Sequence, residues 1–262
     1  MIVITMKVAI SFPLLTLSLC LAQSAERVEI ELMTHAEIHD AIHKQGKTTV
    51  LIYNGGTEQR GPQAVLGGHT FMARRTADAI AQRLGNALVA PVLPFSPAGS
   101  HLNPKTPGSV DLPPDLYAKV NELVVASMVT NGFRNIVLMG DHGGGQQDLA
   151  NLAGVLDKRY APRGVHVYFC SSVYKEARDD FNAWLKEHGY PVGTHASIPD
   201  TSELMYLGGD DYVRKDRLVK GSPDNGIVGD PRRSSPEIGK QVFDMKVDYG
   251  VKEIRRLISG KP

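Results

Sequence analysis

Short β-rich runs that alternate with longer helical segments constrain the fold of this chain more than any other feature. The β-rich runs cover residues 48–53, 87–93, 135–139 and 165–169. Apolar spacing and capping residues predict helices over residues 34–42, 70–84, 112–131, 146–159, 201–208 and 235–259. Strands that alternate with helices predict an α/β fold with a mostly parallel sheet flanked by helices.

Length and composition are those of an ordinary globular protein. The chain has 262 residues, a formal net charge of +1 and 42% hydrophobic residues. Since no internal repeat or low-complexity linker occurs, we expect one domain over residues 26–262. The near-zero charge offers no electrostatic attraction to nucleic acid or to an acidic membrane surface.

Residues 1–25 have the pattern of a secretory signal peptide. Lys7 precedes an apolar run over residues 8–21, and small or polar residues follow at 22–25. The run is too short to span a bilayer comfortably. We therefore expect cleavage, no stable membrane insertion afterwards, and a periplasmic or secreted protein. An uncleaved anchor, or a true start at Met6, is the alternative.

Cysteine chemistry is limited by the two cysteines that the chain contains. Cys20 lies in the predicted signal peptide, which leaves Cys170 without a partner for a disulfide or a cysteine metal cluster. Cys170 ends an apolar, strand-like run, so the sequence predicts a buried core thiol rather than a nucleophile.

Polar candidates for chemistry follow three of the predicted strands. Glu58 follows the first strand, His101 the second and His142 the third. Because sites in parallel α/β sheets lie beyond the carboxyl ends of the strands, we expect these residues at one edge of the sheet. Glycine and proline around Glu58 force an irregular path that could turn Glu58 and His69 toward one point, or could form an ordinary surface loop.

Two further clusters have competing interpretations. The glycines at 143–145 could present backbone amides to a ligand or form a simple turn, and the lysine and hydroxyl of a phosphate-binding loop are missing. Asp200, Thr201 or Ser202 could cap the next helix. Capping would explain most of that segment but not His195.

Five short motifs follow one another between about residues 48 and 240. They are Gly-Thr-Glu-Gln-Arg-Gly-Pro at 56–62, His101 before Thr-Pro-Gly-Ser at 106–109, Gly-Asp-His-Gly-Gly-Gly at 140–145, His-Ala-Ser-Ile-Pro-Asp-Thr-Ser at 195–202 and Gly-Ile-Val-Gly-Asp-Pro at 226–231. In this order they resemble the motifs of the creatinine amidohydrolase (creatininase) family. Five weak motifs in order are more specific than any one of them alone.

The resemblance implies two divalent metals at the edge of an α/β sheet, hydrolysis of small C–N bonds, and a homo-oligomer. Glu58 and His142 match family ligands of one metal. His69 stands where the family has an aspartate that bridges both metals, and Arg60 where it has a histidine of the second metal. A guanidinium has no acceptor to offer a metal, and its charge repels a cation. The chain therefore resembles a divergent member with an altered second-metal site.

These departures predict one metal rather than two. Glu58, His69 and His142 form a set of two histidines and one carboxylate, which is the composition of a catalytic zinc site. Iron or manganese also fits such ligands, because ligand type alone does not select the metal. The expected cofactor is one divalent ion, with zinc the first choice.

The resemblance also suggests catalytic roles. Asp200 matches a family glutamate near the metals and is a candidate fourth metal ligand or base. His195 matches a family histidine assigned to proton transfer, and we expect Arg60 to neutralise a substrate carboxylate or an oxyanion. The predicted function is a metal-dependent hydrolase that cleaves a C–N bond of a small amide, lactam, formamide or cyclic imide through a metal-bound water.

The main alternative is a catalytically inactive, creatininase-like periplasmic protein that binds a small molecule. Arg60 and His69 would then mark a loss of activity. A serine hydrolase has less support, because no Gly-x-Ser-x-Gly motif occurs. Trp184, in an expected loop before His195, could stack on a substrate ring or pack inside the protein.

Overall fold

The computed structural model describes residues 27–99 and 102–260. The predicted signal peptide and His101 lie outside these ranges, so the expectations for both stay predictions. Within the ranges, no helix combines the length and the hydropathy that crossing a membrane requires.

A parallel sheet of four strands forms the centre of the described part of the chain. Its strands are β1 (Thr49–Asn54), β2 (Ala87–Val89), β3 (Asn135–Gly140) and β4 (His166–Phe169), in the order β2-β1-β3-β4. β1 and β3 pair along their full lengths, so their carboxyl ends are neighbours, with Asn54 opposite Gly140. The predicted parallel sheet is confirmed, although β2 ends at Val89 rather than at residue 93.

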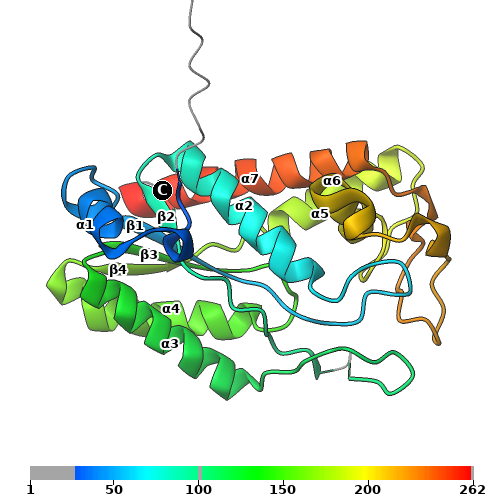
Figure 1. Cartoon of the computed structure of the whole chain (residues 1–262), viewed down its shortest axis with the longest axis horizontal. Helices are drawn as coiled ribbons and strands as arrows, with labels where there is room; N and C mark the ends of the chain where they lie inside the picture. The colour runs from blue at the N-terminus through cyan, green and yellow to red at the C-terminus, as the bar shows by residue number, and fades with distance from the viewer. Residues whose placement is uncertain (1–26, 100–101, 261–262) are drawn as a thin grey trace, which may run out of the picture.

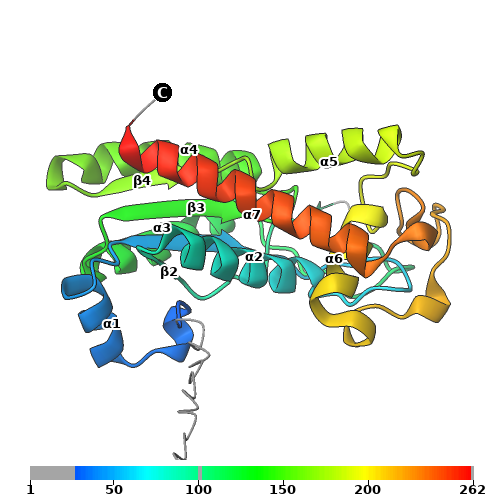
Figure 2. The ribbon, with the colours of Figure 1, turned by 90° about the horizontal axis from the view of Figure 1, so that it is seen from above.

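Helices cover both faces of the sheet. They are α1 (His35–His43), α2 (Gly68–Leu84), α3 (Pro114–Asn131), α4 (Gln146–Tyr160), α5 (Lys175–Glu187), α6 (Ile198–Gly208) and α7 (Pro236–Ser259). Figure 1 shows α2 and α7 over one face, and α3 and α4 over the other. In Figure 2, α5, α6 and the start of α7 extend past the carboxyl ends of the strands, while α1 lies at the opposite end.

Local signals explain several helix boundaries. Thr34 and Glu37 form a reciprocal capping box at the start of α1. α3 begins at Pro114 and ends before Gly132, whose left-handed φ of 103° is a conformation that glycine adopts without strain.

The core lies between the sheet and its helices. Residues such as Val50, Leu51, Ile136 and Leu138 are fully buried, because both faces of the central strands are covered. Cys170 is also buried, as predicted, and burial together with the nearby Glu253 carboxylate raises the pKa of its thiol well above the usual range.

α5 corrects one expectation. Trp184 lies in this helix and not in a loop, and its ring stacks on Phe181 and His188. Ala177, Phe181 and Leu185 repeat at helical spacing and are buried, partly against α7. The sequence therefore contained a helical signal here. Trp184 is not among the residues that line the cavity described below.

The start of α6 corrects a second expectation. The helix begins at Ile198, its N-cap residue is Ser197, and no side chain caps it. Asp200 instead lies in the first turn, where Oδ2 accepts a hydrogen bond from the backbone N–H of Ala196 at 2.8 Å. Ala196 has a φ of 50° and is the one described residue other than glycine in the left-handed region. This turn fixes the direction of His195.

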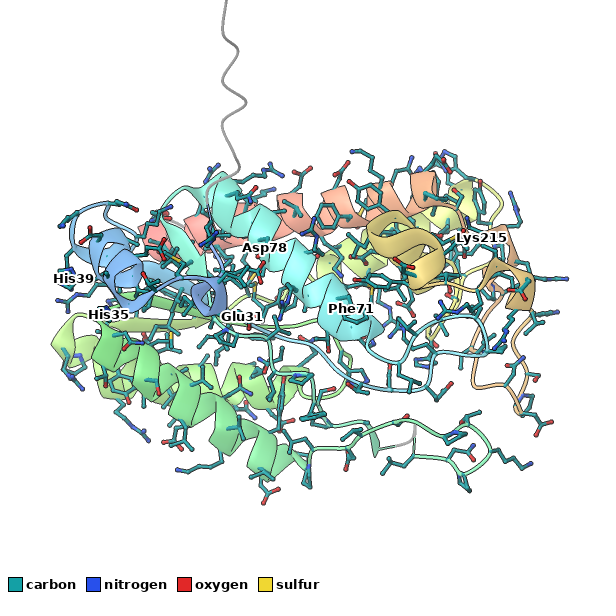
Figure 3. The ribbon with its side chains drawn as sticks, viewed as in Figure 1. Glu31, His35, His39, Phe71, Asp78 and Lys215 are labelled. Carbon is teal, nitrogen blue, oxygen red and sulfur yellow. The ribbon has the colours of Figure 1, made fainter. Side chains whose placement is uncertain are left out.

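Asp78 is a buried carboxylate on α2 and is labelled in Figure 3. Burial, the charge of Glu29 and a hydrogen bond to it raise the pKa of Asp78 to about 7, against the opposing charges of Arg75 and Arg74. Asp78 does not line the cavity described below.

Candidate functional site

Three predicted metal ligands meet at the carboxyl end of the sheet. Glu58 follows β1, His142 follows β3, and His69 lies in the first turn of α2. All three side chains are buried. The parallel register of β1 and β3 brings Glu58 and His142 together, although they are 84 residues apart.

The ligand atoms of these residues lie within 4.8 Å of one another. His69 Nε2 lies 2.9 Å from Glu58 Oε1, and His142 Nε2 lies 2.9 Å from Glu58 Oε2. Ligand atoms around a tetrahedral zinc ion are separated by about 3.3 Å, so small side-chain shifts would accommodate one ion. The donor set fits a divalent metal, and no other group of this kind occurs within residues 27–99 and 102–260.

Glu58 is a strongly acidic carboxyl group in this setting. Burial alone would raise its pKa, but hydrogen bonds from His142 and His69 and their charges outweigh burial and lower the pKa far below its usual range. Glu58 is therefore ionised at neutral pH and can serve as an anionic ligand.

Asp141 orients His69 and was not predicted as a site residue. Its Oδ2 lies 2.8 Å from His69 Nδ1. A carboxylate on Nδ1 directs the other ring nitrogen toward Glu58, which is a common arrangement behind metal-ligating histidines. Burial and Arg60 act to lower the pKa of His69, but hydrogen bonds to Asp141 and Glu58 outweigh them and raise it. The sequence signal that could have identified Asp141 as a site residue is its position next to His142 in a glycine-rich segment.

Two further charged residues were missed by sequence reasoning. Lys246 of α7 contacts Asp141 Oδ1, and its Nζ lies 3.1 Å from both carboxylate oxygens of Glu203 on α6. All three groups are buried. Burial raises the pKa of Glu203 to about 7, with Lys246 acting against this and Asp141 adding to it. We call Asp141, Glu203 and Lys246 the buried ion network.

The glycine-rich segment after β3 positions His142. The backbone N–H of Gly144 donates to His142 Nδ1 at 3.0 Å. A Cβ at Gly144 would lie 2.0 Å from the backbone oxygen of Pro97, so a side chain does not fit there. Gln146 Nε2 donates to the backbone oxygen of His142 at 2.7 Å. The amide of Gly144 thus contacts the histidine, which makes the segment more than a simple turn.

His195 lies beside the three predicted ligands. Its Nε2 lies 2.7 Å from the backbone oxygen of Gln59 and 3.2 Å from the side-chain Nε2 of the same residue. Because the backbone oxygen is the nearer of the two and can only accept a hydrogen bond, we assign the ring proton to Nε2. Its Nδ1 lies 3.5 Å from Glu58 Oε1. His195 is buried and lines the cavity.

Arg60 and Asp200 form a pair behind Glu58. The Arg60 side chain is 0% exposed, with NH1 at 3.4 Å from Glu58 Oε1 and NH2 at 3.2 Å from Asp200 Oδ2. Burial would raise the pKa of Asp200, but the charges of Arg60, His69 and His195 lower it. Asp200 lines the cavity and Arg60 does not. Arg60 therefore lies behind the cavity wall, away from the contact with a substrate that the sequence suggested.

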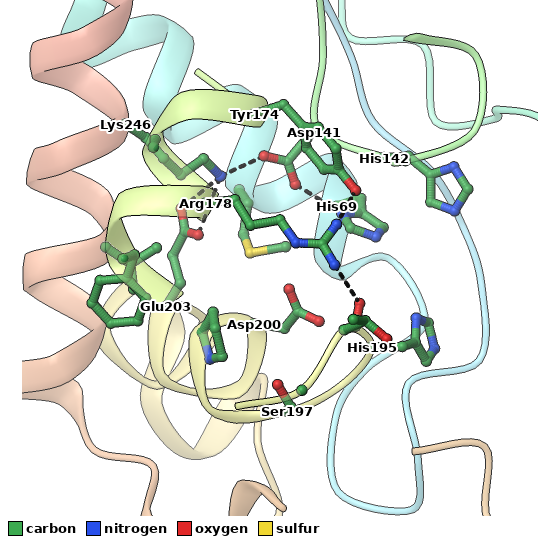
Figure 4. Close-up of a pocket in the computed structure, with 18 of the residues that line it drawn as sticks. His69, Asp141, His142, Tyr174, Arg178, His195, Ser197, Asp200, Glu203 and Lys246 are labelled. Atoms are coloured by element: carbon green, nitrogen blue, oxygen red, sulfur yellow. Dashed lines mark hydrogen bonds and ion pairs between the residues drawn. The ribbon is translucent and has the colours of Figure 1, made fainter. Parts of the chain in front are cut away.

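A cavity of about 260 Å³ opens in front of these residues. Figure 4 shows His69, His142 and His195 on one side, and Lys246 and Glu203 on the other. Apolar side chains complete the lining, among them Met72, Val173, Phe181 and Val242. The volume lies just below the usual range of about 300–1,000 Å³ for ligand pockets.

Comparisons with known proteins agree with this geometry. The creatinine amidohydrolase family model matches residues 31–254. The mycofactocin precursor peptide peptidase of Mycolicibacterium smegmatis is 26% identical over 233 residues, which cover 79% of this chain and 84% of that protein. The 3-dehydro-scyllo-inosose hydrolase of Thermotoga maritima is 27% identical over 116 residues, which cover 44% of this chain and 36% of that protein.

Solved structures share the fold. A manganese form of creatininase has a TM-score of 0.72 and 19% identity, with coverage of 88% of this chain and 98% of that chain. A creatininase variant of the Zn–Zn type has a TM-score of 0.73 and 20% identity, with the same coverage. The family model covers most of the chain and the fold agrees, so this chain belongs to the creatinine amidohydrolase, or creatininase, family.

Proposed function

We propose that this protein is a metal-dependent hydrolase that cleaves the C–N bond of a small amide, lactam, formamide or cyclic imide. The observation that carries the proposal is the convergence of the Glu58 carboxylate with the imidazoles of His69 and His142 at the wall of a cavity. The similarity to a creatinine amidohydrolase and to a peptidase supports hydrolysis at a C–N bond.

One divalent ion, with zinc first and iron or manganese as alternatives, would be held by Glu58, His69 and His142. Bound there, the ion would lower the pKa of a coordinated water and polarise the substrate carbonyl. Arg60 favours one ion over two, because its guanidinium already lies 3.4 Å from Glu58 and would repel a second cation.

His195 is the proposed proton carrier. Since its Nε2–H donates to Gln59, the neutral ring has its basic nitrogen at Nδ1, which faces Glu58. Nδ1 can therefore accept a proton beside the ligands and return it to the leaving nitrogen.

Asp200 is the proposed partner of the attacking water. Its carboxylate is ionised at neutral pH and reaches the cavity, where it can orient a water or take its proton. Because Arg60 and the backbone N–H of Ala196 both contact Oδ2, they hold the carboxylate in one direction. The proposed role of Arg60 is to position Asp200 and Glu58 from behind.

Export and self-association are part of the proposal. The signal pattern at residues 1–25 supports a periplasmic or secreted protein, and the family resemblance supports a homo-oligomer. Mass spectrometry of the mature protein would find an N-terminus between residues 23 and 26. Light scattering after gel filtration would find a mass above that of one 28.5 kDa chain.

A small-molecule-binding protein without catalysis is the second candidate. The observation in its favour is that both histidines donate toward Glu58 while Gly144 and Asp141 occupy their other ring nitrogens. The cluster can thus satisfy its own hydrogen bonds, and the same cavity would then serve for binding alone.

Metal analysis and hydrolysis assays separate the two candidates. We expect about one zinc per chain after zinc loading and hydrolysis of at least one lactam, formamide or cyclic imide. His69→Ala should remove both the metal and the activity, whereas His166→Ala, at a histidine exposed on β4, should change neither. Two tightly bound ions per chain would refute the single-ion site, and a ligand bound without turnover would favour the binding protein.

A further inference from the structure

Arg178 is a cationic residue of the cavity to which the proposed chemistry assigns no part. It lines the cavity with Tyr174, Ala177 and Phe181, which lie on the same face of α5 or immediately before it. Figure 4 shows its guanidinium extending between Tyr174 and His195 into the middle of the cavity.

Neutral groups hold Arg178 in place. NH1 donates to the hydroxyl of Tyr174 at 2.7 Å, and NH2 donates to the backbone oxygen of Thr194 at 3.5 Å. The guanidinium carbon also lies 5.6 Å from the centre of the Tyr174 ring. These contacts fix the direction of the side chain, and none of them involves a carboxylate.

The other cations near the cavity are neutralised by carboxylates. Lys246 pairs with Asp141 and Glu203, and Arg60 pairs with Glu58 and Asp200. Arg178, by contrast, forms no ion pair with a carboxylate among the described residues. A guanidinium has five N–H donors, and the two contacts above leave donors that can reach a ligand.

The charge of a loaded site would favour an anion. The described residues that line the cavity include four carboxylates, from Glu58, Asp141, Asp200 and Glu203. Arg178 and Lys246 in the lining, Arg60 behind Asp200 and one divalent ion would together carry five positive charges against these four negative ones. The raised pKa of Glu203 reduces the negative charge further. An excess of positive charge in a confined site attracts negatively charged ligands.

The remaining lining limits the size and character of the ligand. Met72, Val173, Phe181 and Val242 make part of the wall apolar, within a volume of about 260 Å³. A carboxylate at Arg178 and an amide at the ligand cluster would leave a short apolar body to contact this wall.

We propose that Arg178 binds a carboxylate of the substrate, so that small acidic amides with a short apolar body are the preferred substrates. This inference rests on the proposed hydrolase function and names the substrate class of the same site. Arginine suits the task, because its planar donors match the two oxygens of a carboxylate.

Matched pairs of probes test the proposal. Pyroglutamate is paired with its parent lactam, pyrrolidone, and N-formylleucine with N-formylleucinamide, so that each pair differs in one negative charge. Titration calorimetry on the zinc-supplemented full chain should show tighter binding of the acid in at least one pair. Arg178→Gln should weaken the binding of that acid by roughly ten- to a hundredfold and change the affinity for its neutral partner by less than about twofold.

Two further variants control for charge and folding. Arg178→Lys keeps the charge but loses the planar donors, so it should retain part of the preference for the acid. Lys175→Gln removes a positive charge from the same helix, at a residue that is exposed and pairs with Asp179, and should not change the preference. Thermal unfolding of each variant verifies that it is folded.

Several outcomes would overturn the proposal. They are equal affinities within both pairs, no measurable binding of either acid, or an acid preference that survives Arg178→Gln. Where a probe is hydrolysed, a variant that lowers kcat equally for acid and neutral substrates, with KM unchanged, would assign Arg178 to the transition state instead. Zinc content of the same samples distinguishes this failure from that of the hydrolase proposal, because Arg178 is not one of the three proposed ligands.

Discussion

The two sides of the cavity are built in different ways. The sheet side, formed by the loops after β1 and β3 and the first turn of α2, carries the proposed metal ligands Glu58, His69 and His142. The helical side, formed by α5, α6 and α7, carries Arg178, Glu203 and Lys246. Parallel strand pairing sets the positions on the first side, whereas buried charges and apolar packing set them on the second.

The two sides should therefore control different properties of the protein. We expect the sheet side to determine metal binding, and the helical side to determine stability and the choice of substrate. Asp141 joins the two sides, because Oδ2 faces His69 and Oδ1 faces Lys246. Variants on each side, ordered below by the size of the expected effect, test whether the division holds.

The largest effect is expected on the sheet side. Glu58→Gln keeps the shape of the side chain but removes the charge that faces both histidines, so bound zinc should be lost and hydrolysis should fall by roughly a thousandfold or more. Elemental analysis and turnover of a probe amide measure these changes. Zinc retained at the wild-type level would show that Glu58 is not a ligand.

On the helical side, Lys246→Met should lower the free energy of unfolding by about 3 kcal/mol. The cause is that Asp141 and Glu203 lose their buried counter-charge. Urea unfolding measures the loss, and adding Glu203→Gln should restore part of it. Lys252→Met, an exposed residue of the same helix, is the control. Equal stability of the two single variants would contradict the role of the buried ion network.

At the junction of the two sides, Asp141→Asn should weaken zinc binding by about 10- to 100-fold, because the carboxylate that orients His69 is lost. Competition with a chromogenic chelator gives the affinity. Tyr53→Phe serves as the control, since it removes a hydrogen bond to the same carboxylate and keeps the contact with His69. If both variants weaken zinc binding equally, the effect comes from disturbed packing around Asp141 and not from its contact with His69.

The smallest effect is expected outside both sides, at Asp78. Its folded-state pKa of about 7 exceeds the unfolded value, so the folded protein holds a proton that the unfolded chain releases. Wild-type stability should therefore fall, relative to Asp78→Asn, as the pH rises from about 4 to about 7. Melting temperatures at about pH 5 and about pH 8 measure this. The melting temperature of Asp78→Asn, relative to that of the wild type, should be higher at about pH 8 than at about pH 5.

The control for Asp78 is Asp244→Asn, an exposed carboxylate paired with Lys240. Its melting temperature relative to wild type should stay nearly constant between the two pH values. A parallel response of both variants would mean that overall charge, and not the interaction of Asp78 with Glu29, causes the pH dependence.

The sheet side was largely predictable from the sequence. Its strands are β-rich runs, and Glu58 and His142 follow strands that a parallel sheet places side by side, so local patterns and one topological rule locate them. The order of motifs added His69 and His195. The structure brings all four together within one site.

The helical side was not predictable in the same way. Lys246 resembles any lysine of an amphipathic helix, and its role appears only when the fold places it against Asp141, 105 residues earlier. Glu203 is, in the sequence, one carboxylate within a predicted helix over residues 201–208. Arg178 lies on a helix whose apolar spacing was present but overlooked. Burial of a charge depends on tertiary contacts, which single-sequence patterns do not contain.

Arg60 gives the site a positive charge that belongs to the polypeptide itself. A metal ion can be lost by dilution, chelation or competition, but a guanidinium that is part of the chain cannot leave the site. In the proposed single-ion site, one of the two cations of a two-metal centre is thus replaced by a permanent one. With the proposed single-ion site, the protein would then need half as many ions to reach its working state.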